Sequence, residues 1–61
     1  MFNLIETRLP YYRGTVATAA TVEAALAAIP AKIVCADEDA DNPGHWDVFA
    51  ANGNLYVIEP A

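Results

Sequence analysis

Residues 45–59 read HWDVFAANGNLYVIE, and this stretch decides the fold. Two runs rich in β-branched and aromatic residues, 45–50 and 55–59, lie on either side of Asn52-Gly53. Asn-Gly is a strong signal for a tight hairpin turn, because such a turn needs positive φ at both central positions. The stretch therefore predicts two antiparallel strands joined by a two-residue turn.

A two-residue turn at Asn52-Gly53 also predicts which side chains share a face. Phe49 lies opposite Tyr56, Val48 opposite Val57, and Asp47 opposite Ile58 in this register. Directly opposed residues lie on the same face of a sheet. One face then carries Trp46, Val48, Ala50, Leu55 and Val57, and the other carries His45, Asp47, Phe49, Tyr56 and Ile58.

The region before this hairpin predicts one helix, residues 19–29. Val22, Ala25, Leu26 and Ile29 have the i, i+3, i+4, i+7 spacing of a single apolar stripe. Either Thr18 or Thr21 is suited to cap the first turn, and Pro30 ends the helix, because the residue before a proline avoids the α region.

The remaining segments complete an α+β domain. Residues 2–9 and 31–36 are predicted strands, 11–14 a connection, and 37–44 an acidic loop. The order is β-α-β-β-β, with one helix packed on a mainly antiparallel sheet and a three-strand meander at the C-terminal end. At 61 residues the chain is a single domain, 1–61.

A single helix cannot cover both faces of such a sheet. Phe49, Tyr56 and Ile58 are therefore predicted to lie exposed, where an antiparallel sheet normally carries polar residues. Ala24 and Ala28 leave the outer side of the helix smooth as well. Exposed apolar patches often mark interaction sites. We expect a non-enzymatic protein-interaction module, a homodimer or a domain with another protein partner, unless Tyr11, Tyr12 or the first strand covers the second face.

Charge narrows the choice of partner. Eight acidic and three basic residues give a formal net charge of −5, and the three cations are scattered. Binding to a phosphate backbone needs clustered Lys or Arg, so direct nucleic-acid binding is not expected. The four acidic residues Asp37, Glu38, Asp39 and Asp41 instead offer a contact for a basic protein.

In size and layout the chain resembles the small proteins carried by phages and mobile elements, which include inhibitors of bacterial defence. The resemblance rests on Ile5-Glu6-Thr7 in the first strand, Glu23-Ala24-Ala25-Leu26 in the helix and the closing segment 55–59. It implies an alternative function, an acidic inhibitor that binds a basic, nucleic-acid-handling protein through the loop at 37–41.

A second alternative is a weak divalent-cation site in the same loop. Asp37, Asp39 and Asp41 alternate like the first ligands of a calcium loop, with Glu38 between them. The EF-hand pattern then requires Gly at its sixth position and Glu at its twelfth, where this sequence has Asn42 and Val48. A solvated acidic loop without metal is the expectation.

Catalysis is not expected. The chain has no serine, its three glycines stand singly, and Cys35 is its only thiol. These features offer neither a nucleophile with a matching base nor a phosphate-binding loop, and they imply no cofactor. A single cysteine excludes an internal disulfide and suits a reducing cytoplasm. Residues 16–29, the longest weakly polar stretch, are too short and too polar to span a membrane.

Overall fold

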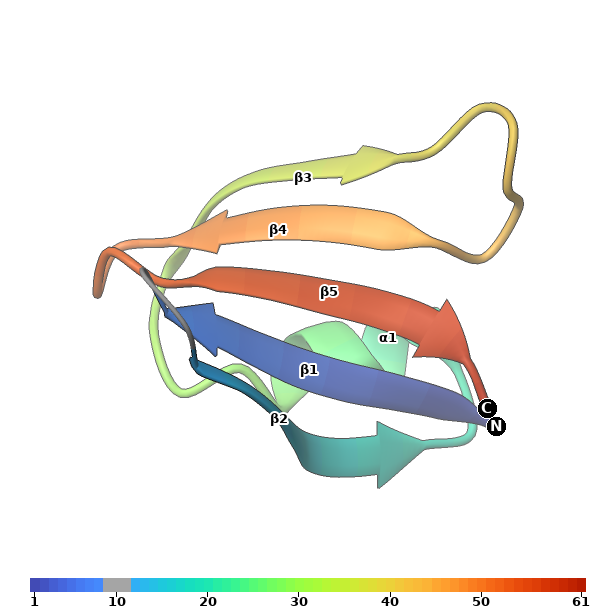
Figure 1. The fold of residues 1–61 in the computed structure, drawn as a ribbon, viewed down its shortest axis with the longest axis horizontal. Helices are drawn as coiled ribbons and strands as arrows, with labels where there is room; N and C mark the ends of the chain where they lie inside the picture. Colours follow the sequence, from blue (N-terminus) through green and yellow to red (C-terminus); the bar gives the residue numbers. More distant parts are fainter. Residues whose placement is uncertain (9–11) are drawn as a thin grey trace.

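The chain forms an antiparallel sheet with one short helix packed against it. The computed structural model describes residues 1–8 and 12–61, and these contain five strands and one helix. The strands are β1 (Phe2–Arg8), β2 (Tyr12–Ala19), β3 (Ile33–Glu38), β4 (Trp46–Ala50) and β5 (Leu55–Pro60), and the helix is α1 (Val22–Ala27). Their order across the sheet is β2-β1-β5-β4-β3, and every neighbouring pair is antiparallel (Figure 1).

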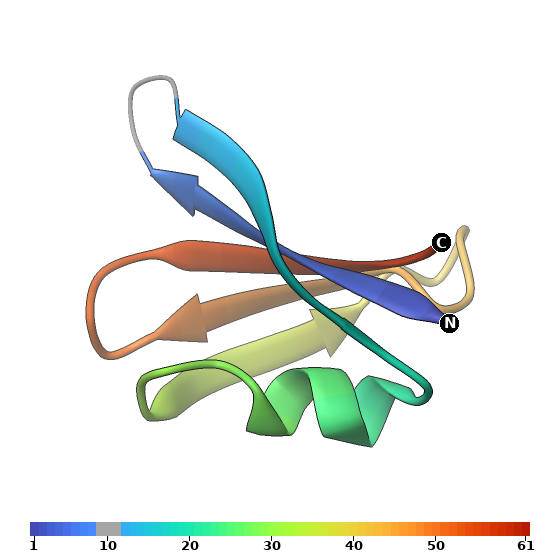
Figure 2. The same cartoon turned by 90° about the horizontal axis from the view of Figure 1, so that it is seen from below.

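The helix covers one side of the sheet. Figure 2 shows α1 beneath the strands, where it contacts β1 and β2. Its chain direction carries the backbone from β2 at one edge of the sheet to β3 at the opposite edge. The core lies between these two layers and consists of Leu4, Ala25, Ile29, Val48, Ala50, Tyr56 and Ile58.

The helix is present but shorter than the sequence predicts. It begins at Val22, and Thr21 is its cap: the Thr21 hydroxyl accepts a hydrogen bond from the Ala24 N–H at 3.1 Å. Ala25 and Ile29 are buried, and Val22 and Leu26 pack against the core, so the predicted apolar stripe is confirmed. Ala28 caps the C-terminal end, two residues before Pro30.

The predicted β-α-β-β-β order is wrong at one place, because a strand precedes the helix. Residues 12–19, expected as a connection and the start of the helix, form β2 and pair with β1. Thr15, Val16 and Thr18 are β-branched, and tertiary pairing with β1 outweighs the helix propensity of the neighbouring alanines. The molecule is mostly sheet, and the C-terminal three-strand meander of β3, β4 and β5 is confirmed.

The last hairpin has a three-residue loop, so the predicted pairing is wrong by one residue. Ala50 N–H donates to the Asn54 carbonyl at 3.2 Å, and Gly53 N–H donates to the Ala50 carbonyl at 3.0 Å. Ala51 to Gly53 therefore form the loop, and Gly53 alone has positive φ, at 85°. A turn followed by a left-handed glycine is the common three-residue hairpin connection.

This shift moves β5 relative to β4 and exchanges its two faces. Val48 lies opposite Tyr56, Phe49 opposite Leu55, and Asp47 opposite Val57. Since the side-chain repeat of a strand is two residues, a slip of one residue sends each side chain to the other face. Tyr56 and Ile58, predicted to be exposed, are fully buried on the side of α1.

Candidate functional site

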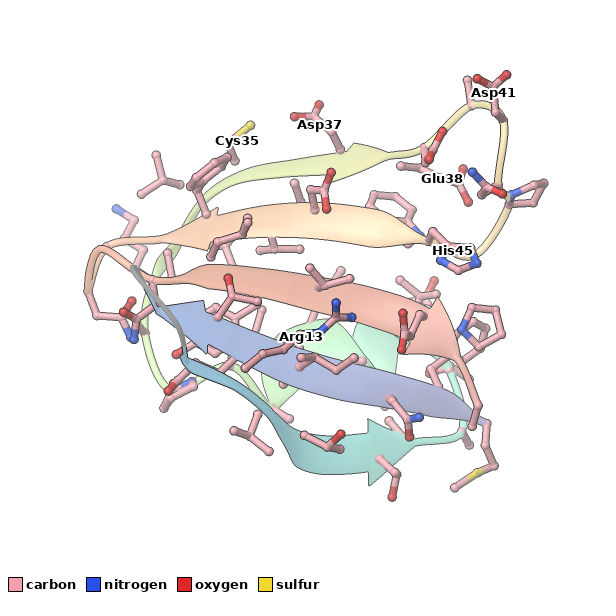
Figure 3. All side chains as sticks on the ribbon, viewed as in Figure 1. Arg13, Cys35, Asp37, Glu38, Asp41 and His45 are labelled. Atoms are coloured by element: carbon pink, nitrogen blue, oxygen red, sulfur yellow. The ribbon has the colours of Figure 1, made fainter. Side chains whose placement is uncertain are left out.

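The candidate site is the sheet face turned away from α1, here called the open face. No described segment packs over it, and Figure 3 views the molecule from this side. The register places two rows of side chains across the strands. From β3 to β2, the first row is Cys35, Phe49, Leu55, Thr7 and Arg13, and the second is Asp37, Asp47, Val57, Ile5 and Thr15.

The middle of the open face is apolar. Phe49 is 53% exposed, while Leu55 and Val57 beside it are half-buried. Of the three residues predicted on this face, Phe49 is therefore the one that lies there. Sequence reasoning missed Leu55 and Val57 because the two-residue turn assigned them to the core.

Arg13 closes the β1 side of this face. Its guanidinium lies 3.6 Å from the Glu59 carboxylate, which links β2 to β5 across β1. Arg13 lies opposite Thr7 and Glu59 lies opposite Asn3, so Ile5 stands between these two positions on β1. Ile5, in the second row of this face, is only 5% exposed. Tyr11 and the Tyr12 side chain, the predicted cover, lie outside the described residues.

The β3 side of the open face is acidic. Asp37 and Asp47 lie directly opposite each other on β3 and β4, and both are exposed. Like charges in directly opposed positions destabilise a sheet. Asp37, expected in a loop with Glu38, belongs with it to the end of β3. Asp47 was predicted on the same face as Phe49, but its pairing with Asp37 was not, because Asp37 was expected in the loop after the strand.

Cys35 is exposed and hydrogen-bonded to Asp37 of this pair. Its thiol donates to Asp37 Oδ2 at 3.1 Å, and Figure 3 shows both side chains projecting from β3 at the rim of the sheet. The hydrogen bond and the negative charge of Asp37 raise the pKa of the Cys35 thiol. The thiolate is thus disfavoured at neutral pH, which makes Cys35 a poor nucleophile. Figure 3 also shows His45 far from Cys35, at the other end of the β3–β4 pair.

The acidic loop that follows β3 is held by its own hydrogen bonds. Asp39 Oδ1 accepts from the Asp41 N–H at 2.9 Å, and Asp39 Oδ2 accepts from the Asn42 amide at 3.0 Å. These bonds, led by the one from Asn42, lower the pKa of Asp39. Glu38 Oε2 accepts from the Gly44 N–H at 3.1 Å and fastens the far end of the loop to β3.

These hydrogen bonds argue against the divalent-cation site that the sequence offers as an alternative. Asp39 and Glu38 direct carboxylate oxygens at groups of the loop itself. Across residues 1–8 and 12–61, no group of three or more His, Cys, Asp or Glu side chains is arranged to hold a metal ion. The structure does not bring Asp37, Glu38, Asp39 and Asp41 together as one ligand set.

The predicted helix contact is exposed but small. Ala24 and Ala28 lie on the outer side of α1 and are exposed. Because α1 has only six residues, this surface offers less area than the sheet. None of the helices in the described part of the chain is long and apolar enough to cross a membrane.

A buried polar network on the α1 side of the sheet was not predicted. Tyr56 OH donates to Glu6 Oε2 at 2.9 Å and accepts from the Asn52 amide at 3.0 Å. Glu6, opposite Tyr56 on β1, is 7% exposed. The network joins β1, β5 and the hairpin loop, so it holds the three-residue loop and its register in place.

Comparison with known proteins gives no relative for this arrangement. No protein-family model matches the chain, and no curated protein or solved structure is significantly similar to it.

Proposed function

We propose that the protein is a non-enzymatic interaction module that binds a basic protein through the acidic side of the open face. Phe49 provides the apolar contact. Asp37 on β3 and Asp47 opposite it on β4 provide the negative charge. This layout matches the usual anatomy of an interface, with an apolar centre and a polar rim. The proposal retains the cytoplasmic location expected from the single cysteine.

The observation that carries the proposal is the opposed pair Asp37 and Asp47. In the free protein this pair costs stability, since neither carboxylate has a cation across the strand. A Lys or Arg side chain placed between the two carboxylates would remove the repulsion. Phe49, 53% exposed and one row away, would be covered by the same partner.

Charge also distinguishes a basic partner from a second copy of the chain. Two copies meeting face to face bring Asp37, Asp47 and Glu59 of each toward the other, with Arg13 as the cation described on that face. At a net charge of −5 per chain, such an approach is repulsive at low salt. The homodimer stays a prediction, and the basic partner is the better match to the charges on the open face.

Capture from a lysate of the source cells, with quantitative comparison of variants, tests the proposal. The protein is immobilised as wild type, as Phe49→Glu, as Asp47→Asn, and as a control, Glu23→Gln. The control removes the same charge as Asp47→Asn at an exposed position of α1, away from the open face. We expect the wild type and the control to retain a basic protein that both open-face variants lose.

Two results contradict the proposal. One is a captured protein that all four forms retain equally, because its binding then needs neither Phe49 nor the acidic pair. The other is self-association of the wild type, seen by light scattering at low micromolar concentration and abolished by Phe49→Glu, which assigns the open face to a second copy.

A further inference from the structure

β3 is an edge strand whose outer side is unpaired among the described residues. Asp39 N–H donates to the His45 carbonyl at 2.8 Å, which fixes the alternation of the β3–β4 ladder. In an antiparallel pair, residues two apart direct their backbone groups to the same side. Cys35 and Asp37 therefore point their N–H and C=O groups toward β4, and Ala36 and Glu38 point theirs outward.

The usable part of this edge is short and regular. A register shift between Ile33 and Cys35 makes Val34 an extra residue, and its side chain is 70% exposed. Bulges of this kind interrupt pairing at sheet edges. From Cys35 to Glu38 the register runs without interruption. A partner strand can thus pair over these four residues, with the exposed Val34 next to them.

The side chains along this edge are acidic on both faces of the sheet. Asp37 lies on the open face, and Glu38, the next residue, lies on the other. Asp39 and Asp41 continue the negative charge into the loop, at the same corner of the molecule (Figure 3). A strand added at β3 meets carboxylates on either side, so its own side chains at those positions must be basic.

From this placement we infer that the partner docks by adding an extended basic segment to the outer edge of β3. The inference rests on the proposed function and names the binding mode of the same partner. Backbone hydrogen bonds to Ala36 and Glu38 supply the pairing, and the acidic residues select the sequence, as in other complexes formed by strand addition.

A second copy of the chain is the less suitable occupant of this edge. Pairing β3 with β3 of another copy sets Asp37 and Glu38 against the same acids, which is repulsive. Pairing β3 with the opposite edge, β2, is a head-to-tail contact that leaves a free β3 at one end and a free β2 at the other. The edge acids thus disfavour pairing with a second β3, and the head-to-tail pairing with β2 does not close, whereas a basic strand matches the charge of this edge.

A synthetic peptide tests the inference directly. The probe is acetyl-TVRKRVT-amide, whose symmetric sequence fits either strand direction. Its control has the same sequence and charge but carries N-methyl groups on alternate residues along one edge, and a second control is methylated along the other edge. Binding is measured by titration into the ¹⁵N-labelled protein, and hydrogen exchange of the Ala36 and Glu38 amides is followed in the same samples.

The expected result has two parts. The unmethylated peptide binds at least about tenfold more tightly than one of the methylated controls, since lost backbone hydrogen bonds contribute on the order of 1 kcal/mol each. The amides of Ala36 and Glu38 become protected from exchange in the complex, and the amides of β2 do not.

Variants of β3 give an independent result. Ala36→Pro removes an N–H group that points outward, so no hydrogen bond between β3 and β4 is lost. An edge strand tolerates proline at such a position. Ala36→Gly keeps the N–H and weakens the strand, so it controls for stability. We expect Ala36→Pro to lose at least about tenfold in affinity for the peptide relative to Ala36→Gly.

The outcomes separate this inference from the proposed function. Equal binding of all three peptides without protection at Ala36 and Glu38 overturns strand addition and leaves binding of basic groups to the open face intact. Absence of binding to the unmethylated peptide also overturns it, while the capture experiment on Phe49 and the Asp37–Asp47 pair decides the proposed function separately.

Discussion

At the scale of single residues, the opposed carboxylates of Asp37 and Asp47 are the most informative pair in the molecule. A protein selected for stability alone has little reason to place two acids directly opposite each other on neighbouring strands. Their presence next to an exposed Phe49 is what a binding surface requires, because sites for charged partners are often stabilised only in the complex.

We predict that Asp47→Asn stabilises the free protein. The substitution removes repulsion from Asp37 and breaks no described side-chain hydrogen bond of the loop or of Cys35. The midpoint of thermal unfolding should rise by about 1–5 °C, measured by circular dichroism at low salt. Asp41→Asn, the same change at an exposed loop position, should leave the midpoint almost unchanged. A lower midpoint for Asp47→Asn would show that the pair does not repel.

The pKa of the Cys35 thiol depends on the carboxylate of Asp37. Because the thiol donates to the Asp37 carboxylate, the pKa of Cys35 is raised and its reactive thiolate forms at higher pH than in an ordinary thiol. Asp37→Asn should lower the pKa of Cys35, so that the pH profile of iodoacetamide alkylation shifts toward neutral pH. Asp47→Asn should shift the profile less, since Asp37 is the group in contact. Identical profiles for the three proteins would contradict the contact.

At the scale of elements, the sequence predicts the helix and the C-terminal meander because their signals are local. The stripe of Val22, Ala25, Leu26 and Ile29 needs no information from elsewhere in the chain, and neither does the Thr21 cap. β2 was missed because residues 12–19 mix alanine with β-branched residues, and only pairing with β1 decides between helix and strand. The cue that remained unused was Thr15, Val16 and Thr18 within five residues.

The register of the last hairpin shows most clearly where prediction from local sequence signals fails. Asn52-Gly53 fits a two-residue turn, but Ala51-Asn52-Gly53 fits a three-residue loop equally well, and the difference exchanges the faces of β5. The positions of the acidic residues distinguish the two loops. In the observed register Asp47 and Glu59 share the open face, whereas the two-residue turn places one of them in the core. Two of the five predicted interface residues, Tyr56 and Ile58, are buried because of this shift of one residue.

Tyr56 allows the register to be tested in solution. In the structure its hydroxyl is buried and bonded to Glu6 and Asn52, so Tyr56→Phe should lower the free energy of unfolding by about 1–2 kcal/mol. On an exposed face the same change would be nearly neutral, within about 0.5 kcal/mol. Denaturant unfolding distinguishes the two, and a neutral result would restore the two-residue turn.

At the scale of the whole molecule, the fold is as compact as a free-standing chain of its size. Its accessible surface is 3917 Å², close to the roughly 3,800 Å² typical of a 6.5 kDa monomer. Among the described residues, the sheet nevertheless leaves one face without a covering layer. The open face is a surface available for function.

Charge is unevenly distributed over this molecule. Five of the eight acidic residues, the four at 37–41 and Asp47, lie on or next to β3 and β4, while Arg13 lies on the β2 side. Such a distribution orients an approaching basic partner and speeds its association at low salt. Association that slows steeply with added salt is the corresponding expectation for the captured partner.

Mapping the contact on the protein itself tests the central claim most directly. Amide spectra of the ¹⁵N-labelled protein are recorded during titration with the basic protein that capture identifies. The account predicts that the largest shifts fall on Asp37, Asp47, Phe49 and their neighbours in β3 and β4, with α1 unchanged. Shifts centred on Ala24 and Ala28 of α1, with β3 and β4 unaffected, would contradict it.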